Sequence, residues 1–177
     1  MTEALKNEYL NKHLPYRLNS LMAHDMMLHR KELPQYDLIK DSCYGDSLVV
    51  EPAFEISLIF GRSLLNFLGL GLNFSNNTIN RKEPRGTDFS IKDLFPTRDF
   101  CDLNDPILIN FNVNLATLIK IADKSVAHMT SILTQEEEHA KLPDARKAIY
   151  CLVLKYIPEI KKENIWWYSQ VDKAIIL

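Results

Sequence analysis

One apolar stripe does most to constrain how this chain folds. Between Asn114 and Leu133, hydrophobic residues recur every three or four positions, the spacing that places side chains on one side of an α-helix. The stripe consists of Leu115, Leu118, Ile119, Ala122, Val126, Met129 and Leu133. Lys120, Lys124 and His128 follow one another at intervals of one turn and form a row on a neighbouring face. The pattern predicts a long helix with one face in the core and polar groups beside it.

Other segments show the same periodicity, interrupted by prolines. Thr2 is the expected N-cap of a first helix, and Pro15 either kinks this helix or begins a second one. Glu51-Pro52 opens a strongly apolar helix, and Gly69 marks its end. Thr134 and Glu137 form a capping box, which predicts a further helix start at Thr134.

Two regions lack a clear helical pattern. The segment from about 73 to 110 is rich in turn residues and predicts a long irregular insertion. Its cations, Arg81, Lys82 and Arg85, suit either an anionic partner or a solvated loop, and the solvated loop is the favoured interpretation. Four apolar residues are expected to hold the insertion to the body: Phe89, Ile91, Leu94 and Phe95. The tail from about 161 to 177 contains Trp166, Trp167 and Tyr168 and is expected to fold back or pack on a partner.

The composition fits one globular domain. A chain of 177 residues with 46% hydrophobic and 25% charged residues is long enough for one core, so we predict a single all-α domain over 1–177, a bundle of five or six helices. The net charge of −2 argues against a strongly basic nucleic-acid binder but allows a local basic patch. Three widely spaced cysteines, Cys43, Cys101 and Cys151, favour a reducing cytoplasm. The most apolar run, Ile56–Leu72, is interrupted by Arg62, so no membrane span is expected.

Two groups of polar residues are candidates for chemistry. His128 beside Lys124 suits either a general base or a core-edge histidine that is hydrogen-bonded to a neighbouring helix, and the residues alone favour the core-edge histidine. Glu55 and Arg62 are seven residues apart on one helix face, and Asn66 continues their line one turn later. This line serves either phosphate binding or the joining of neighbouring helices or of a dimer partner.

The sequence predicts neither a metal site nor a cofactor. His24, Asp25 and His29 are poorly spaced for metal ligands on a helix and favour a polar surface. No phosphate-binding loop motif, dinucleotide fingerprint or zinc-protease motif is present.

The segment Ala122–His128, ADKSVAH, resembles the signature region of the HEPN superfamily, small helical-bundle proteins that are often dimeric and occur in toxin–antitoxin and phage-defence systems. That signature is an Arg shortly before a His, often with Asn or Asp after the Arg and Ala before the His. Asp123, Lys124, Ala127 and His128 match this style, whereas Ala122 stands where the Arg is expected. The run Arg62–Gly69 is also similar to the helix that precedes the motif in these proteins.

The resemblance implies a protein that binds RNA or a nucleotide at a cleft, in a homodimer. It implies catalytic roles for His128, Lys124 and Arg62, and binding roles for Asp123, Glu55, Asn66 and Lys120. In an active ribonuclease, His128 assists proton transfer at the 2′-hydroxyl, and Arg62 or Lys124 offsets the phosphate charge in place of the missing Arg. The enzyme is then weak or inactive. The alternative is a non-catalytic regulatory or immunity protein that binds a protein partner through its aromatic tail.

Overall fold

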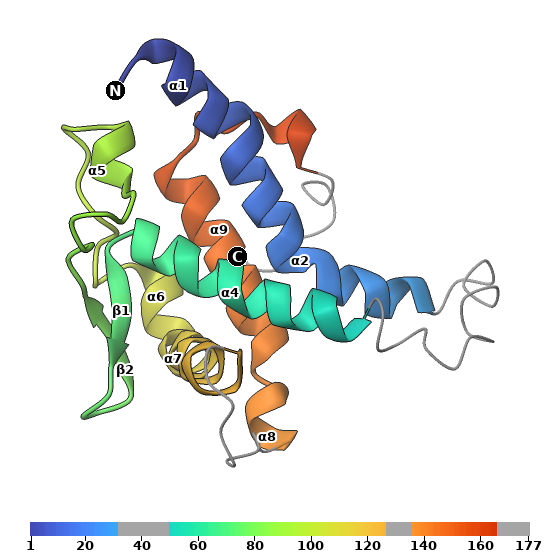
Figure 1. Cartoon of the computed structure of the whole chain (residues 1–177). Coiled ribbons are helices and arrows are strands. Elements are labelled where there is room, and N and C mark those ends of the chain that lie inside the picture. Colours follow the sequence, from blue (N-terminus) through green and yellow to red (C-terminus); the bar gives the residue numbers. More distant parts are fainter. Residues whose placement is uncertain (32–49, 127–135, 166–177) are drawn as a thin grey trace.

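A computed structural model describes residues 1–31, 50–126 and 136–165 of the chain. Helices make up most of these residues, and a two-stranded antiparallel sheet lies beside them. Figure 1 shows helix α4 across the middle of the molecule, with α2 and α9 packed near it and the sheet at one edge. The helical bundle is confirmed in its broad form, but the prediction of an all-α fold is wrong because of the sheet.

The N-terminal helices follow the predicted punctuation. Helix α1 (Glu3–Glu8) is capped by Thr2, whose side-chain oxygen accepts a hydrogen bond of 3.3 Å from the Leu5 N–H. A π-helical turn, η1 (Tyr9–His13), connects α1 to α2 (Leu14–Lys31). Pro15 lies in the first turn of α2, directly after the π-helical turn η1. At this position the missing N–H of proline does not interrupt a regular series of α-helical hydrogen bonds.

Helix α4 (Glu51–Phe67) is the element on which the candidate site is built. Pro52 lies in its first turn, as predicted. The helix gives way to Gly69, whose φ of 74° is a left-handed conformation that favours glycine. A Cβ at this position would also lie 2.4 Å from Cγ of Phe100. The predicted helix end at Gly69 therefore has two physical causes.

The predicted irregular insertion contains a β-hairpin. Strand β1 (Leu70–Asn73) pairs with β2 (Thr78–Arg81), with Leu70 opposite Arg81. Asn77 adopts a positive φ of 53° in the connecting turn, a conformation that Asn tolerates better than most residues. Strands of four residues are too short to show the alternation by which strands are recognised, so turn residues dominated the sequence pattern.

The remainder of the insertion has short helices that are held to the core. Helix α5 (Ile91–Leu94) begins with a capping box between Ser90 and Asp93, and α6 (Pro106–Asn110) is capped by Asp105. Ile91 and Leu94 are buried, and Phe89 and Phe95 pack against the core, so the four predicted anchors are confirmed.

The second half of the bundle contains the first part of the predicted long helix, as far as Val126. Helix α7 (Asn112–Ile121) continues into a π-helical segment, η4 (Ala122–Val126), and residues 127–135, which include Thr134, lie outside the described residues. Then follow α8 (Glu136–His139), α9 (Leu142–Tyr156) with Pro143 in its first turn, and the short 3-10 helix η5 (Lys162–Asn164). The predicted tail aromatics Trp166, Trp167 and Tyr168 also lie outside the described residues.

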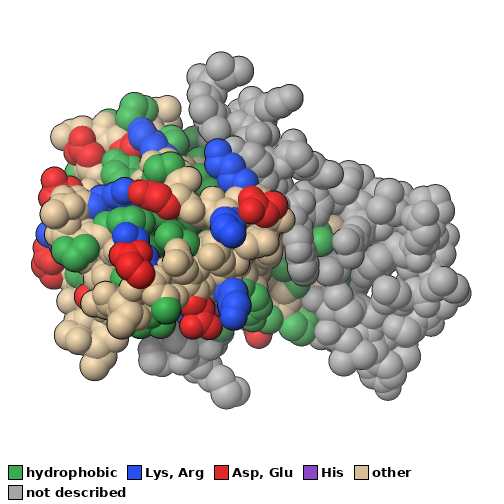
Figure 2. Space-filling view, turned by 90° about the horizontal axis from the view of Figure 1, so that it is seen from above, with side chains coloured by type: hydrophobic (Ala, Val, Ile, Leu, Met, Phe, Trp, Pro, Cys, Tyr) green, Lys and Arg blue, Asp and Glu red, His purple; other side chains and the backbone are tan. Residues whose placement is uncertain are grey.

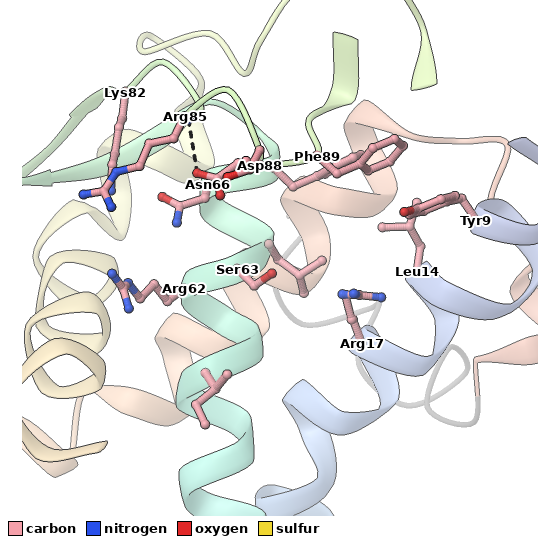
Figure 3. Close-up of a pocket in the computed structure, with 14 residues that line it drawn as sticks. Tyr9, Leu14, Arg17, Arg62, Ser63, Asn66, Lys82, Arg85, Asp88 and Phe89 are labelled. Carbon is pink, nitrogen blue, oxygen red and sulfur yellow. Dashed lines mark hydrogen bonds between the residues drawn. The ribbon is translucent and has the colours of Figure 1, made fainter. Parts of the chain in front are cut away.

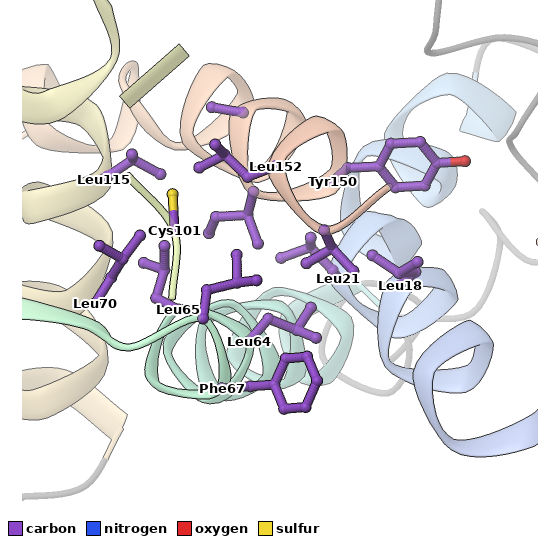
Figure 4. Packing of buried hydrophobic residues seen from close by; sticks show 14 of the residues in the cluster. Leu18, Leu21, Leu64, Leu65, Phe67, Leu70, Cys101, Leu115, Tyr150 and Leu152 are labelled. Carbon is purple, nitrogen blue, oxygen red and sulfur yellow. The ribbon is translucent and has the colours of Figure 1, made fainter. Parts of the chain in front are cut away.

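The core is formed where α2, α4, α7 and α9 meet. Figure 4 shows leucines from α2 and α4 packed against side chains of α9, with Leu115 of α7 at the edge of the cluster. Most of these side chains are fully buried, and the exposed face of α4 is turned away from them. None of the helices in the described ranges is both long and apolar enough to cross a bilayer.

Candidate anion-binding cleft

A cleft of about 460 Å³ lies over the outer face of α4. Its walls come from η1 and α2 on one side and from the loop after β2 on the other (Figure 3). Among the described residues that line it, four are cationic, Arg17, Arg62, Lys82 and Arg85, and one is acidic, Asp88. This imbalance favours an anionic ligand, because a concave surface lined with one sign of charge concentrates its field there.

The face of the molecule seen from above has a more balanced charge. In Figure 2, which views the molecule from above, basic side chains lie beside acidic ones and alternate with hydrophobic groups. The net charge of −2 likewise shows no overall excess of basic residues. The positive character of the cleft is therefore local. This is the local basic patch that the net charge of the chain allowed.

Arg62 is held in the cleft by Asp123. The Arg62 Nε lies 2.9 Å from Oδ1 of Asp123, which belongs to η4, and the Arg62 side chain is 40% exposed. Both residues are candidates from the sequence, and the structure brings them together. A guanidinium bound through one nitrogen has a restricted orientation and offers further donors in a planar fork, which matches phosphate geometry.

Arg17 lies at the opposite side of the cleft. Its Nη1 donates a hydrogen bond of 3.1 Å to the carbonyl oxygen of His13, and its guanidinium stacks over the Phe60 ring at 5.8 Å from the centroid. These contacts come from η1 and α4, so the position of Arg17 is set by two elements. The sequence did not single out this residue, because one arginine on an amphipathic helix carries no local motif.

The loop after β2 brings two further cations to the cleft. The Arg85 N–H donates to Oδ2 of Asp88 at 3.1 Å, and the Asp88 N–H donates to the Arg85 carbonyl at 2.8 Å, which closes a tight turn. The Lys82 side chain packs against Gly71 of β1, so closely that a Cβ added at Gly71 would lie 2.3 Å from Cδ of Lys82. The structure thus places Lys82 and Arg85 at the cleft.

Arg81 has a different role from its neighbours. Its Nη2 donates to the carbonyl oxygen of Cys101 at 2.8 Å, and its guanidinium lies over the Phe100 ring. These bonds attach β2 to the segment that follows α5. Of the three cations that the sequence grouped together, one therefore anchors the hairpin and the other two line the cleft.

Uncharged polar groups and aromatic rings complete the lining. Ser63 and Asn66 project from α4 into the cleft (Figure 3). At one end, the rings of Tyr9 and Phe89 stack with centroids 4.1 Å apart, and Phe67 lies 6.1 Å from Phe89. Asn66, a predicted binding residue, lines the cleft, and its binding role stays a prediction.

Three other predicted site residues, Glu55, Lys120 and Lys124, are described by the structure and do not line this cleft. Glu55 is exposed on α4 but is not part of the lining. Lys120 forms an ion pair of 2.5 Å with Glu138, and Lys124 is half-buried on η4. His128, the predicted general base, lies outside the described residues.

A second polar group lies in the interior between α2 and α9. Arg146 is 1% exposed and binds Asp25 through Nε, at 2.8 Å from Oδ2, and through Nη2, which also lies 3.4 Å from Nδ1 of His24. Burial raises the pKa of Asp25, but hydrogen bonds from His24 and Arg146 outweigh it and leave this pKa below its usual value. His24 and Asp25 are 15% and 22% exposed, so they lie at the edge of the interior, where Asp25 pairs with a buried arginine that the polar-surface interpretation did not include. Within the described ranges, no group of three side chains suited to metal binding occurs.

The fold and the cleft together define a class: a mostly helical protein with a basic groove on the outside of a core helix. Comparison with protein-family models, with curated proteins and with solved structures found no match for this chain.

Proposed function

We propose that the protein binds RNA or a nucleotide through phosphate groups at the cleft on α4. The observation that carries this proposal is the set of four cations against one acid around a single concavity. Phosphate oxygens accept charge-assisted hydrogen bonds from arginine and lysine, and these bonds are stronger than neutral ones. Ser63 and Asn66 add uncharged hydrogen-bonding groups suited to sugar or base atoms.

The resemblance to the HEPN superfamily supports the same ligand class. Asp123, from the segment that carries the resemblance, contacts Arg62 in the cleft, so this segment begins beside the basic groups. If the protein is a ribonuclease, His128 acts on the 2′-hydroxyl and Arg62 balances the phosphate charge. The homodimer and the role in a defence or toxin–antitoxin system stay predictions of the resemblance.

Binding is tested with a fluorescently labelled ten-nucleotide RNA and anisotropy titrations. Arg62→Gln is expected to weaken binding about tenfold, equivalent to about 1.4 kcal/mol, because it removes a charge-assisted contact. Lys12→Gln is the matched control, since Lys12 is 75% exposed and lies outside the cleft lining. Equal losses in the two variants indicate nonspecific attraction and contradict the proposal.

Catalysis is a separate question and has its own test. Degradation of the same RNA is compared between the wild type and His128→Ala. Loss of activity in the variant supports the ribonuclease, whereas equal activity in both, or none in either, removes it and leaves a binding protein.

The alternative function, a non-catalytic interaction protein, rests on the aromatic tail. Trp166, Trp167 and Tyr168 lie outside the described residues, so this alternative stays a prediction from the sequence. This alternative is favoured by two results together. RNA and nucleotides fail to bind the protein, and a protein partner binds the intact chain but not a variant in which both tryptophans are replaced.

A further inference from the structure

The cations of the cleft lie on two different flanks of α4. Phe60 and Arg62 are two residues apart, which corresponds to about 200° around the helix. Arg17 stacks over Phe60, whereas Arg62 is bound to Asp123 on η4. Arg17 and Arg62 therefore stand on nearly opposite sides of α4, with the exposed face of the helix between them.

The remaining two cations lie on the Arg62 side. Figure 3 shows Lys82, Arg85 and Arg62 together at one side of the view and Arg17 at the other, with Ser63 between them. The cleft thus has a group of three cations, a middle section and a single cation. The two charged ends are separated by roughly the diameter of a helix with side chains, about 10 Å.

The middle section has no cation, and the one acid of the lining, Asp88, lies at its edge beside Asn66 (Figure 3). Ser63 and Asn66 lie there on α4, together with Ile59, whose side chain is 48% exposed. A single phosphate spans only a few ångströms and cannot contact both charged ends. A ligand that uses the whole cleft therefore needs two anionic groups with a less charged part between them.

We propose that the cleft binds a single oligonucleotide strand across α4, with one phosphate at Arg62, Lys82 and Arg85 and a second, separate phosphate at Arg17. This inference rests on the proposed function and specifies its ligand. A strand provides phosphates at intervals, joined by sugars and bases that match the polar and apolar floor. Tyr9 and Phe89 end the cleft near Arg17 with an aromatic surface (Figure 3), suited to contact with a base.

The test measures how affinity depends on ligand length. Uridine monophosphate, oligouridylates of two, four, six and eight nucleotides, and inorganic tripolyphosphate compete against a labelled RNA. Affinity is expected to rise from the monophosphate to a strand of a few nucleotides and then to level off. Tripolyphosphate, which has charge but no sugars or bases, is expected to bind at least tenfold more weakly than the hexanucleotide.

Arg17→Gln separates the two phosphate positions. It is expected to weaken the hexanucleotide about tenfold and the monophosphate less than twofold, because the monophosphate occupies the end with three cations. Lys82→Gln combined with Arg85→Gln is expected to weaken both ligands. Arg17→Lys, which keeps the positive charge, is expected to recover part of the hexanucleotide affinity, and thermal unfolding of each variant verifies that it is folded.

The outcomes separate this inference from the function beneath it. If Arg17→Gln weakens the monophosphate and the hexanucleotide equally, or if tripolyphosphate matches the hexanucleotide, the cleft has one anion site and the strand inference is overturned while phosphate binding stands. If no RNA or nucleotide binds to the wild type, both are overturned.

Discussion

Two Arg–Asp pairs in this molecule have the same chemistry and opposite surroundings. Arg146 is 1% exposed and binds Asp25 through two nitrogens in the interior, beside His24. Arg62 is 40% exposed and binds Asp123 through one nitrogen at the edge of the cleft. The two aspartates are about equally exposed, at 22% and 23%, so the pairs differ at the arginine: the Arg146 guanidinium is enclosed by protein, whereas water and ligands have access to the Arg62 guanidinium.

The difference in exposure distinguishes an arginine that stabilises the fold from one that is available to bind a ligand. A buried arginine that loses its partner remains in a medium of low dielectric constant, so its partner is indispensable. An exposed pair contributes little to stability, because water solvates both groups nearly as well. Arg62 can therefore exchange Asp123 for a phosphate with little effect on the fold, whereas Arg146 cannot exchange Asp25.

The largest expected effect comes from breaking the buried pair. Asp25→Ala is expected to lower the free energy of unfolding by about 3–5 kcal/mol, because it leaves the Arg146 charge buried without its carboxylate. Urea unfolding followed by circular dichroism measures the change. Asp123→Ala is the matched control at the exposed pair, with an expected loss of less than about 1 kcal/mol. Similar losses in the two variants would show that exposure does not separate the pairs.

The next largest loss of stability is expected at Gly69, where α4 ends and the hairpin begins. Gly69→Ala is expected to destabilise the protein by about 2–5 kcal/mol, because the left-handed conformation costs about 1–2 kcal/mol and the contact with Phe100 adds an overpacking cost of about 1–3 kcal/mol. Gly86→Ala, in the cleft loop, has open space around its added methyl group and is the control. A thermal melt of both variants compares them, and a Gly69 variant as stable as the Gly86 variant contradicts the assigned strain.

Much of the fold was predictable from the sequence because its signals are local. Thr2 as a cap, Pro52 in a first turn and Gly69 at a helix end each act within one turn of the chain. The hairpin was missed because β1 and β2 have four residues each, and their pairing depends on a contact with α7, where Asn112 accepts from the Ile79 N–H. Such support from a distant element has no local sequence pattern.

The candidate site was less predictable than the fold. Arg62 and Asn66 were found because they follow one another on a helix face, and they do line the cleft. Arg17, Lys82 and Arg85 come from other elements, and only the tertiary structure shows that they share one cavity with Arg62. The buried role of Asp25 was missed for the same reason, since its partner Arg146 is 121 residues away along the chain.

A smaller loss of stability is expected at low pH, through protonation of Asp25 in the buried pair. The pKa of Asp25 in the folded protein is lowered, so the unfolded chain takes up a proton there first as the pH falls. The stabilisation is complete above about pH 4, the usual range of an aspartate, and is lost as the pH falls through the lower folded-state pKa. Urea unfolding between pH 3 and 7 is expected to show a smaller loss in Asp25→Asn than in the wild type. Parallel pH profiles would exclude Asp25 as a source of the acid sensitivity.

The smallest expected change in stability accompanies a change in binding at the exposed pair. Asp123→Asn removes the negative charge beside Arg62 but keeps a hydrogen-bonding group of the same size. The free energy of unfolding is expected to change by less than about 1 kcal/mol. Affinity for RNA is expected to rise a fewfold at low salt, since the carboxylate no longer competes with phosphate for the guanidinium, and salt is expected to reduce this gain. Anisotropy titrations at two salt concentrations measure the gain. If the RNA affinity stays unchanged or falls, the main effect of Asp123 is to orient Arg62 for the ligand and not to compete with the ligand. Arg62 then depends on Asp123 as Arg146 depends on Asp25.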